Sequence, residues 1–329
     1  MSKYEIRPFQ EGDEAGLISC FNAVFGEDDE SFVDRTRDEW DWAFSRNPAG
    51  RRIWVAECEN EIVAQCAALP YRVDIDGQRH SFTQGVDSMV HPAHRRGLRR
   101  PGLFVATAQP FFKQYGGLGG DILHYGWPVE PAWRIGKTFL DYEIIRTQTI
   151  HFRDMEPGPS DLPHGVERLQ RFDDSVEKLY HRCRKQWGAS TLRDAAYLNW
   201  RFAECPRADY DLFGVRDSNG HLLAYAVFRK ADWPRPESGL IMDWLCPHDE
   251  LDAGGLLREA VLNRARALNA RVTLGVFPEH SFWFQHFQAW GFGVFPSDYL
   301  LIGIIQDPRY DTWWLRENWW YQLAELDVV

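Results

Sequence analysis

The chain has 329 residues and a formal net charge of -11, from 48 acidic and 37 basic side chains, and 15% of its residues are aromatic. This length allows two domains or one large one, and either buries enough apolar surface to fold without disulfides or metals. Because phosphate-backbone partners require a basic surface, an acidic chain predicts no nucleic-acid partner.

The ends and cysteines of the chain indicate its compartment. No apolar run approaches the roughly 20 residues of a membrane span, and the first residues contain no apolar signal segment. We therefore expect no membrane contact and a cytoplasmic location. The cysteines are widely spaced and form no C-x-x-C pair, which favours buried reduced thiols over zinc or disulfides.

The first half predicts strands followed by alternating strands and helices. Residues 4–9 alternate apolar and polar side chains as a half-buried strand does, and Asp13 is the expected N-cap of the helix that follows. The remaining expected elements are strands 52–58, 61–69, 71–75 and 79–90, a helix from Leu103 to Phe111, strand 121–127, helix 132–139 and strand 142–151.

Proline and glycine concentrate in residues 155–163 and predict a linker, 155–164, between a domain 1–154 and a domain 165–329. The second domain is expected to contain helices 174–187 and 194–202, strands 210–216, 222–230 and 239–245, helix 255–268, strand 271–277, helix 281–290 and strand 299–305. Both halves repeat the order hairpin, strand, helix, strand, short helix, strand, which indicates an internal duplication. The predicted fold class is α/β (α+β), with a central mixed sheet flanked by helices in each domain.

The most informative stretch connects the strand ending at Val90 to the helix containing Phe104. It holds four arginines and no acid, in a chain that is acidic overall. A helix N-terminus offers free N–H donors and a partial positive charge, glycine lets the backbone approach a ligand, and arginine adds charge in a fork geometry. This combination predicts a pyrophosphate site. The alternative interpretation is a solvated basic turn.

This stretch resembles the acetyl-CoA loop of the GNAT superfamily of N-acyltransferases. Val90-His91-Pro92 matches the lead-in of the family pattern, and Arg99-Arg100-Pro101-Gly102-Leu103-Phe104 matches the part that opens the helix. A second register, with His94 and Gly97 in the first two slots, fits less well. The resemblance implies acetyl-CoA or another acyl-CoA as co-substrate. The residues expected to contact it are Ser88, Met89, Val90, Arg95, Arg96, Gly97, Arg99, Arg100, Gly102, Leu103 and Phe104.

The second half resembles the family over residues 271–292, but its counterpart to the loop, 247–255, is acidic. We therefore expect the second domain to have lost acyl-CoA binding and to complete the acceptor side. Residues 196–202 and 319–327 resemble tandem GNAT proteins of bacterial polysaccharide pathways, some of which acylate a nucleotide-linked amino sugar.

Acyl transfer to an amine needs a base for the ammonium proton, a donor that polarises the carbonyl, and a proton for the thiolate. Asp87 is the first base candidate because it lies on the strand expected to carry the thioester, and His124 and Tyr125 lie on the next strand. The resemblance places the carbonyl donor around Met89, and Tyr125 or Tyr142 is the expected thiolate donor. The competing interpretation is a local hydrogen bond for Asp87 and core packing for the others.

Trp133, His280 and Tyr299 are the candidate acceptor-binding residues, and no metal is expected. The predicted function is N-acyl transfer from acyl-CoA to a primary amine of a small molecule, with a nucleotide-linked amino sugar as the preferred acceptor. Two alternatives remain: a Fem-type transferase that takes its aminoacyl group from tRNA, and a non-catalytic regulator that binds acyl-CoA.

Overall fold

The computed structural model describes residues 3–27, 32–95 and 101–326, and divides into two compact units. The first unit comprises Met1–Arg72, His80–Ile145 and Leu301–Thr312. The second comprises Val73–Arg79, Arg146–Leu300 and Trp313–Val329. Neither unit is a single stretch of sequence, and the expected linker, 155–164, lies inside the second.

The first unit is built on a mixed sheet with the strand order β1–β2–β3–β4–β5–β13. Its strands are β1 (Glu5–Pro8), β2 (Arg52–Cys58), β3 (Glu61–Ile75), β4 (Gln78–Val90), β5 (Asp121–Gly126) and the end of β13 (Gly293–Ile305). The pair β4–β5 is parallel, whereas β1–β2, β2–β3 and β5–β13 are antiparallel. A parallel pair requires a crossover, which α3 supplies.

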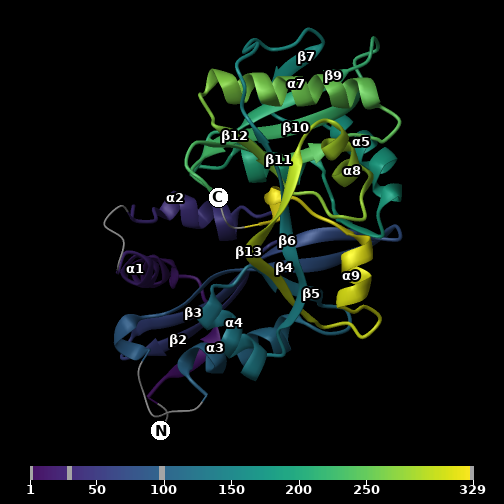
Figure 1. Cartoon of the computed structure of the whole chain (residues 1–329). Coiled ribbons are helices and arrows are strands. Elements are labelled where there is room, and N and C mark those ends of the chain that lie inside the picture. The colour runs from purple at the N-terminus through teal and green to yellow at the C-terminus, as the bar shows by residue number, and fades with distance from the viewer. Residues whose placement is uncertain (1–2, 28–31, 96–100, 327–329) are drawn as a thin grey trace. The chain divides into compact units, whose positions relative to one another are not determined.

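Helices lie on both faces of this sheet. They are α1 (Glu14–Phe25), α2 (Arg37–Trp40) continued by a π-helical turn (Asp41–Ser45), α3 (Leu103–Tyr115) and α4 (Glu130–Phe139). Figure 1 shows α1 and α2 on one face of β2 and β3, and α3 on the other. The side chains of α3 and β3 form an apolar cluster around Cys66, Val105 and Phe111.

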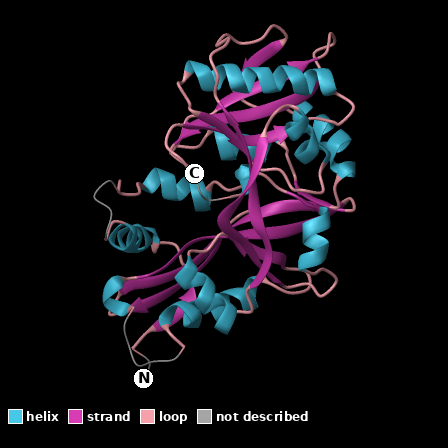
Figure 2. Cartoon of the chain, in the orientation of Figure 1, coloured by secondary structure: helices cyan, strands magenta, loops and turns pink. Residues whose placement is uncertain are grey.

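The second unit repeats this arrangement with the strand order β6–β12–β11–β10–β9–β7. Its strands are β6 (Glu143–Asp154), β7 (Val166–Leu169), β8 (Ala189–Thr191), β9 (Asp211–Arg216), β10 (Leu222–Ala231), β11 (Ser238–Leu245), β12 (Val272–Gly275) and β14 (Trp319–Trp320). Its helices are α5 (Ser175–Cys183), α6 (Ala195–Leu198) continued by a π-helical turn (Asn199–Ala203), α7 (Leu251–Ala267), α8 (Phe282–Ala289) and α9 (Thr312–Asn318). Figure 2 separates these helices, in cyan, from the strands, in magenta.

The last strand of each sheet comes from the other half of the sequence. The end of β13 pairs with β5 in the first unit, from Ile302↔Gly126 to Ile305↔Leu123. The end of β6 pairs with β12 in the second unit, from His151↔Gly275 to Asp154↔Val272. From sequence order alone, β6 would be expected to pair within the first half and β13 within the second. The two repeats have instead exchanged their final strands.

Strand β3 is longer than expected because Pro70 does not interrupt it. Pairing with β2 ends at Ala68, and pairing with β8 begins at Val73. On this edge of β3, Pro70 therefore lies in the gap between the two partner strands, where its missing N–H breaks no pairing with either of them.

Candidate functional site

The neighbouring strands β4 and β5 part in the middle of the first unit. Their paired register runs from Ser81↔Asp121 to Gln84↔Tyr125, whereas β4 continues to Val90. Along this continuation of β4, Gly85 and Ser88 are exposed, whereas Val86 and Met89 are buried. Within the described part of the chain, the continuing part of β4 has no strand partner on the side of β5, so this free edge can pair its N–H and C=O groups with an extended ligand.

The arginine-rich segment is described at its two ends. Arg95 donates from Nε to the Val90 carbonyl at 2.9 Å and from Nη1 to Glu27 Oε2 at 2.6 Å, so its guanidinium is paired in this structure. The candidates Arg96, Gly97, Arg99 and Arg100 lie outside the described residues.

Helix α3 begins directly after this segment, with Gly102 as its N-cap. Among the described residues no side chain caps it, and its first backbone bond runs from Ala106 N to the Gly102 carbonyl at 3.0 Å. A glycine cap leaves the first-turn amides, including those of Leu103 and Phe104, without the oxygen that Ser, Thr or Asp would provide. The N-terminus of α3 thus retains the donors and partial charge that an anion requires.

Asp87 lies just beyond the parting point and has an unusual backbone. Its φ is 51°, in the left-handed region, and its carbonyl accepts a hydrogen bond from Gln65 Nε2 at 2.9 Å. Its carboxylate forms a two-pronged ion pair with Arg35, Oδ1 accepting from Nη2 at 3.2 Å and Oδ2 from Nη1. Both side chains are only 8% exposed. The base candidate is therefore held between a strained backbone and a buried guanidinium.

Arg35, which sequence reasoning missed, comes from the segment between α1 and α2. Its backbone N–H donates to Asn22 Oδ1 at 2.9 Å, and its guanidinium carbon lies 3.6 Å from the centre of the Phe21 ring. No local motif marks this arginine, since its partner is distant in the sequence. The pair fastens the α1–α2 segment to the free edge of β4.

His124 is sealed within the α3 face of the sheet. It is 4% exposed, and neither ring nitrogen has a hydrogen-bond partner among the described residues. The rings of Phe111 and Phe112 lie 5.5 and 5.1 Å away. Burial lowers the pKa of His124 to about 4, against an opposing pull from Asp121. The imidazole is therefore neutral at pH 7. Because neighbouring strand residues alternate in direction, Tyr125, which is also buried, faces away from His124.

Ser88 and Tyr142 both lie beside Cys66 on the α3 face. The Ser88 side chain hydrogen-bonds to Cys66, and burial raises the pKa of that thiol to about 12. The Tyr142 ring packs against Gly136 of α4, and burial raises the pKa of its hydroxyl, with a smaller contribution from Cys66. Tyr142 rather than Tyr125 thus shares a neighbour with the exposed Ser88.

The three acceptor candidates are not brought together within one unit. Trp133 belongs to α4 of the first unit, where the Lys137 ammonium lies 5.7 Å from its ring. His280 and Tyr299 belong to the second unit. His280 Nδ1 lies 3.0 Å from the Arg316 carbonyl, and the Tyr299 hydroxyl accepts a hydrogen bond from Trp233 Nε1 at 3.0 Å.

In the second unit the strands β11 and β12 part in the same way, but other side chains of the chain cover the strand edge. Pairing of β11 with β12 ends at Ile241↔Gly275, and β11 continues to Leu245 with every residue buried. The backbone N–H of Trp244 on this edge donates to Gln322 Oε1 at 2.6 Å, and the Trp283 ring packs against the Trp244 ring. The chain's own C-terminal segment thus occupies the edge that stays exposed in the first unit.

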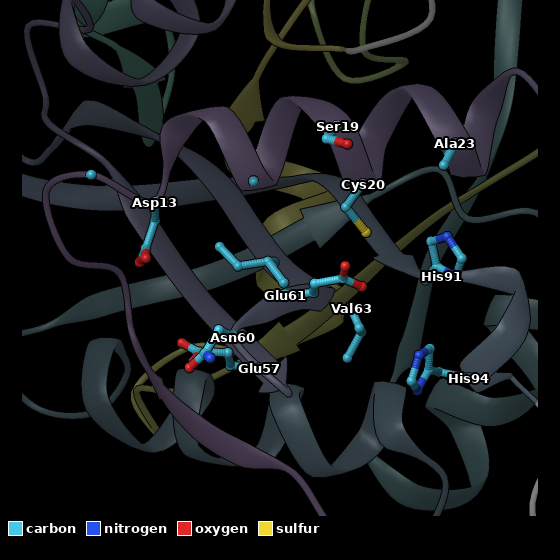
Figure 3. A pocket seen from close by; sticks show the side chains of 13 residues that line it. Asp13, Ser19, Cys20, Ala23, Glu57, Asn60, Glu61, Val63, His91 and His94 are labelled. Carbon is cyan, nitrogen blue, oxygen red and sulfur yellow. The ribbon is translucent and has the colours of Figure 1, made fainter.

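A hollow of 380 Å³ lies between α1 and the β2–β3 hairpin (Figure 3). Asp13, Glu57, Glu61, His91 and His94 line it together with smaller side chains. Arg7 binds Asp13 Oδ2 and Glu57 Oε2, each at 2.7 Å. Since its carboxylates would repel the phosphates of CoA, this hollow does not supply the pyrophosphate site.

Within the described ranges, no three His, Cys, Asp or Glu side chains gather as a metal site requires, and no helix is long and apolar enough to cross a bilayer.

Residues 5–132 match the family model described as an acetyltransferase (GNAT) domain. That range contains the parting of β4 and β5, the arginine-rich segment and α3. Comparison with curated protein sequences finds no match.

Solved structures extend the likeness to almost the whole chain. A protein from Enterococcus faecalis, described as a probable N-acyltransferase, is 13% identical with a TM-score of 0.65, over 93% of this chain and 73% of that one. N-myristoyltransferase from Saccharomyces cerevisiae with bound myristoyl-CoA is 13% identical with a TM-score of 0.60, over 92% and 82%. A tandem GNAT protein from the clavulanic acid biosynthesis pathway is 16% identical with a TM-score of 0.55, over 94% and 100%.

At these identities the solved structures establish the fold. The chain shares the fold of tandem GNAT proteins, and residues 5–132 of its first unit match the model of a GNAT acetyltransferase domain. The expected fold class is therefore confirmed.

Proposed function

We propose that the protein transfers an acyl group from acyl-CoA to a primary amine of a small molecule, using the first unit alone to hold acyl-CoA. The observation that carries this proposal is the exposed edge of β4 beyond Gln84↔Tyr125, followed by an α3 N-terminus that no side chain caps. An extended pantetheine arm can pair with such an edge, and a diphosphate can accept from such a helix end.

Each group that acyl transfer requires is assigned to a residue in this proposal. The thioester supplies an activated carbonyl, and the Met89 N–H is the proposed donor to its oxygen. Gly102, Leu103 and Phe104 would bind phosphate through their amides, beside the arginines that precede them. The Tyr142 hydroxyl, kept protonated by burial, would give its proton to the departing thiolate.

Asp87 stays the proposed base for the ammonium proton, and its ion pair gives it a further role as an anchor of the β4 edge. The two roles differ in kinetics. Loss of a base lowers kcat at neutral pH and changes the pH profile, whereas loss of an anchor lowers kcat without moving the profile. The pH profiles of Asp87→Asn and Arg35→Met, compared side by side, separate them.

The second unit is proposed to complete the acceptor side without binding acyl-CoA, because Gln322 and Trp283 fill its strand edge. The nucleotide-linked amino sugar remains the preferred acceptor on the resemblance of residues 196–202 and 319–327. These segments contact each other, since Arg201 Nε donates to the Ala324 carbonyl at 2.9 Å, and both are largely buried. They therefore support the packing of the second unit.

The test is calorimetric titration of the full chain with acetyl-CoA, followed by thiol release on adding a panel of amines that includes a nucleotide-linked amino sugar. We expect one acetyl-CoA per chain and thiol release with at least one amine. Binding without thiol release for any amine would favour the regulatory alternative. An absence of any acetyl-CoA binding would refute the proposal and favour the tRNA-dependent route.

A further inference from the structure

The second unit contains a cationic hollow that the proposed reaction does not use. It has a volume of 540 Å³, within the range of roughly 300–1,000 Å³ typical of small-molecule pockets. Its lining comes from β6, the segment after it, α7 and the end of α8: Arg153, Pro159, Arg258, Glu259, Leu262, Asn263, Arg266, Ala289 and Trp290.

The charge of this lining is opposite to that of the whole chain. It holds three arginines and a single carboxylate, in a protein of net charge -11. Elsewhere in the described chain arginines commonly meet carboxylates closely, as in the pair Arg52–Asp121 at 2.9 Å. Here, among the residues that the structure describes, the one close carboxylate is Glu259, which lies 3.3 Å from the Nη2 of its sequence neighbour Arg258.

Neutral acceptors hold the other two guanidiniums in place without cancelling their charge. Arg153 Nη1 donates to the Trp290 carbonyl at 2.7 Å. Arg266 donates from Nε to the Glu156 carbonyl at 2.9 Å and from Nη1 to the Pro159 carbonyl at 3.1 Å. Arg266 Nη1 also donates to Asn263 Oδ1 at 2.8 Å. Among the described residues, the Nη2 group of Arg266 and the Nε and Nη2 groups of Arg153 are left for a ligand.

Arg258 is the most telling of the three. Its guanidinium stacks over the Trp290 ring at 5.1 Å, and its Nε is buried without a hydrogen-bond partner in the described structure. Its charge also lowers the pKa of His286, after the larger effect of burial. A buried guanidinium N–H without an acceptor is costly, so the position favours an anionic oxygen.

We propose that this hollow binds a phosphate-bearing small molecule of nucleotide size, at a site built from residues that the acyl-CoA site does not use. Guanidinium groups recognise phosphate through their charge and their paired N–H donors. The three guanidiniums of this lining carry more positive charge than its single carboxylate can neutralise. This inference does not depend on the proposed acyl transfer.

The experiment is calorimetric titration of the full chain with adenosine 5′-diphosphate and, separately, with inorganic pyrophosphate. Arg258→Gln should weaken diphosphate binding at least tenfold, and its 24% exposed side chain makes loss of folding unexpected. Glu259→Gln removes the one opposing carboxylate and should tighten binding several-fold, which damage to the fold cannot imitate. Arg171→Gln, which removes an exposed arginine of the same unit, is the matched control and should change nothing.

Acetyl-CoA titrations of the same variants keep the two proposals apart. Arg258→Gln should leave acetyl-CoA affinity within twofold. Charge reversal at Arg99 and Arg100, which removes diphosphate binding at the first unit, should leave the diphosphate affinity of the hollow in the second unit within twofold. Diphosphate binding that ignores both Arg258→Gln and Glu259→Gln, or that disappears on the Arg99 and Arg100 reversal, would overturn the inference. So would the absence of diphosphate binding at millimolar concentration, whatever the result with acetyl-CoA.

Discussion

The buried pair Arg35–Asp87 joins the α1–α2 segment to the proposed reaction edge, and breaking it has a calculable cost. Replacing Arg35 by Met leaves the Asp87 carboxylate, 8% exposed, without its partner. Removing one member of a buried pair costs about 3–5 kcal/mol. The contact of the guanidinium with Phe21 adds about 0.5–2 kcal/mol. We expect Arg35→Met to lower the free energy of unfolding by at least about 3 kcal/mol.

The measurement is urea unfolding of the wild type, Arg35→Met, Asp87→Asn and the double variant. Because Asn carries no charge, the double variant should be more stable than the sum of the single losses predicts, with a coupling energy above about 1 kcal/mol. Asp87→Gly is the control for the backbone, since glycine adopts the φ of 51° without strain but lacks the carboxylate. A loss below about 1 kcal/mol for Arg35→Met, or strictly additive losses, would refute the assigned strength of this pair.

Three further predictions follow from the first unit. Charge reversal at Arg99 and Arg100 should weaken acetyl-CoA binding by more than about 1 kcal/mol, since charge-assisted contacts contribute about 1.5–3 kcal/mol each; an unchanged Kd by calorimetry would remove the loop from the binding site. Burial holds the pKa of His124 at about 4 in the folded chain, against 6.5 for the free side chain. The unfolded chain therefore binds the extra proton first, and stability should fall by about 3 kcal/mol as the pH drops from 6.5 to 4. His124→Phe should flatten that dependence in urea unfolding, and an equally steep slope would contradict the assignment. Gly136→Ala places a Cβ 2.1 Å from the Tyr142 ring, so it should cost about 1–3 kcal/mol and reduce thiol release, and an unchanged Tm and rate would show that the ring yields freely.

The sequence predicts most elements because their patterns are local. Strand β2 begins and ends where alternation of its side chains predicts, and helix α4 begins two residues earlier than expected. The exchange of β6 and β13 could not be predicted, because either strand satisfies the apolar pattern of either sheet. Which sheet each strand joins is determined by packing between residues that are far apart in the sequence.

In the candidate site, too, local features could be predicted and long-range contacts could not. The N-terminus of α3 at Gly102 follows from a local glycine and the loop before it. Arg35 and Gln322 could not be found, because each acts on a strand edge far away in the sequence. His124 and Tyr125 were expected at one site, yet adjacent strand residues point to opposite faces.

The exchanged strands determine how the two halves of the chain behave when they are expressed separately. A fragment ending near residue 154 lacks Leu301–Ile305, and its sheet would stop at β5 with an unsatisfied edge. The complementary fragment would lack His151–Asp154 beside β12. Neither piece is expected to remain dispersed when produced alone, whereas the two produced together can trade these strands and reassemble.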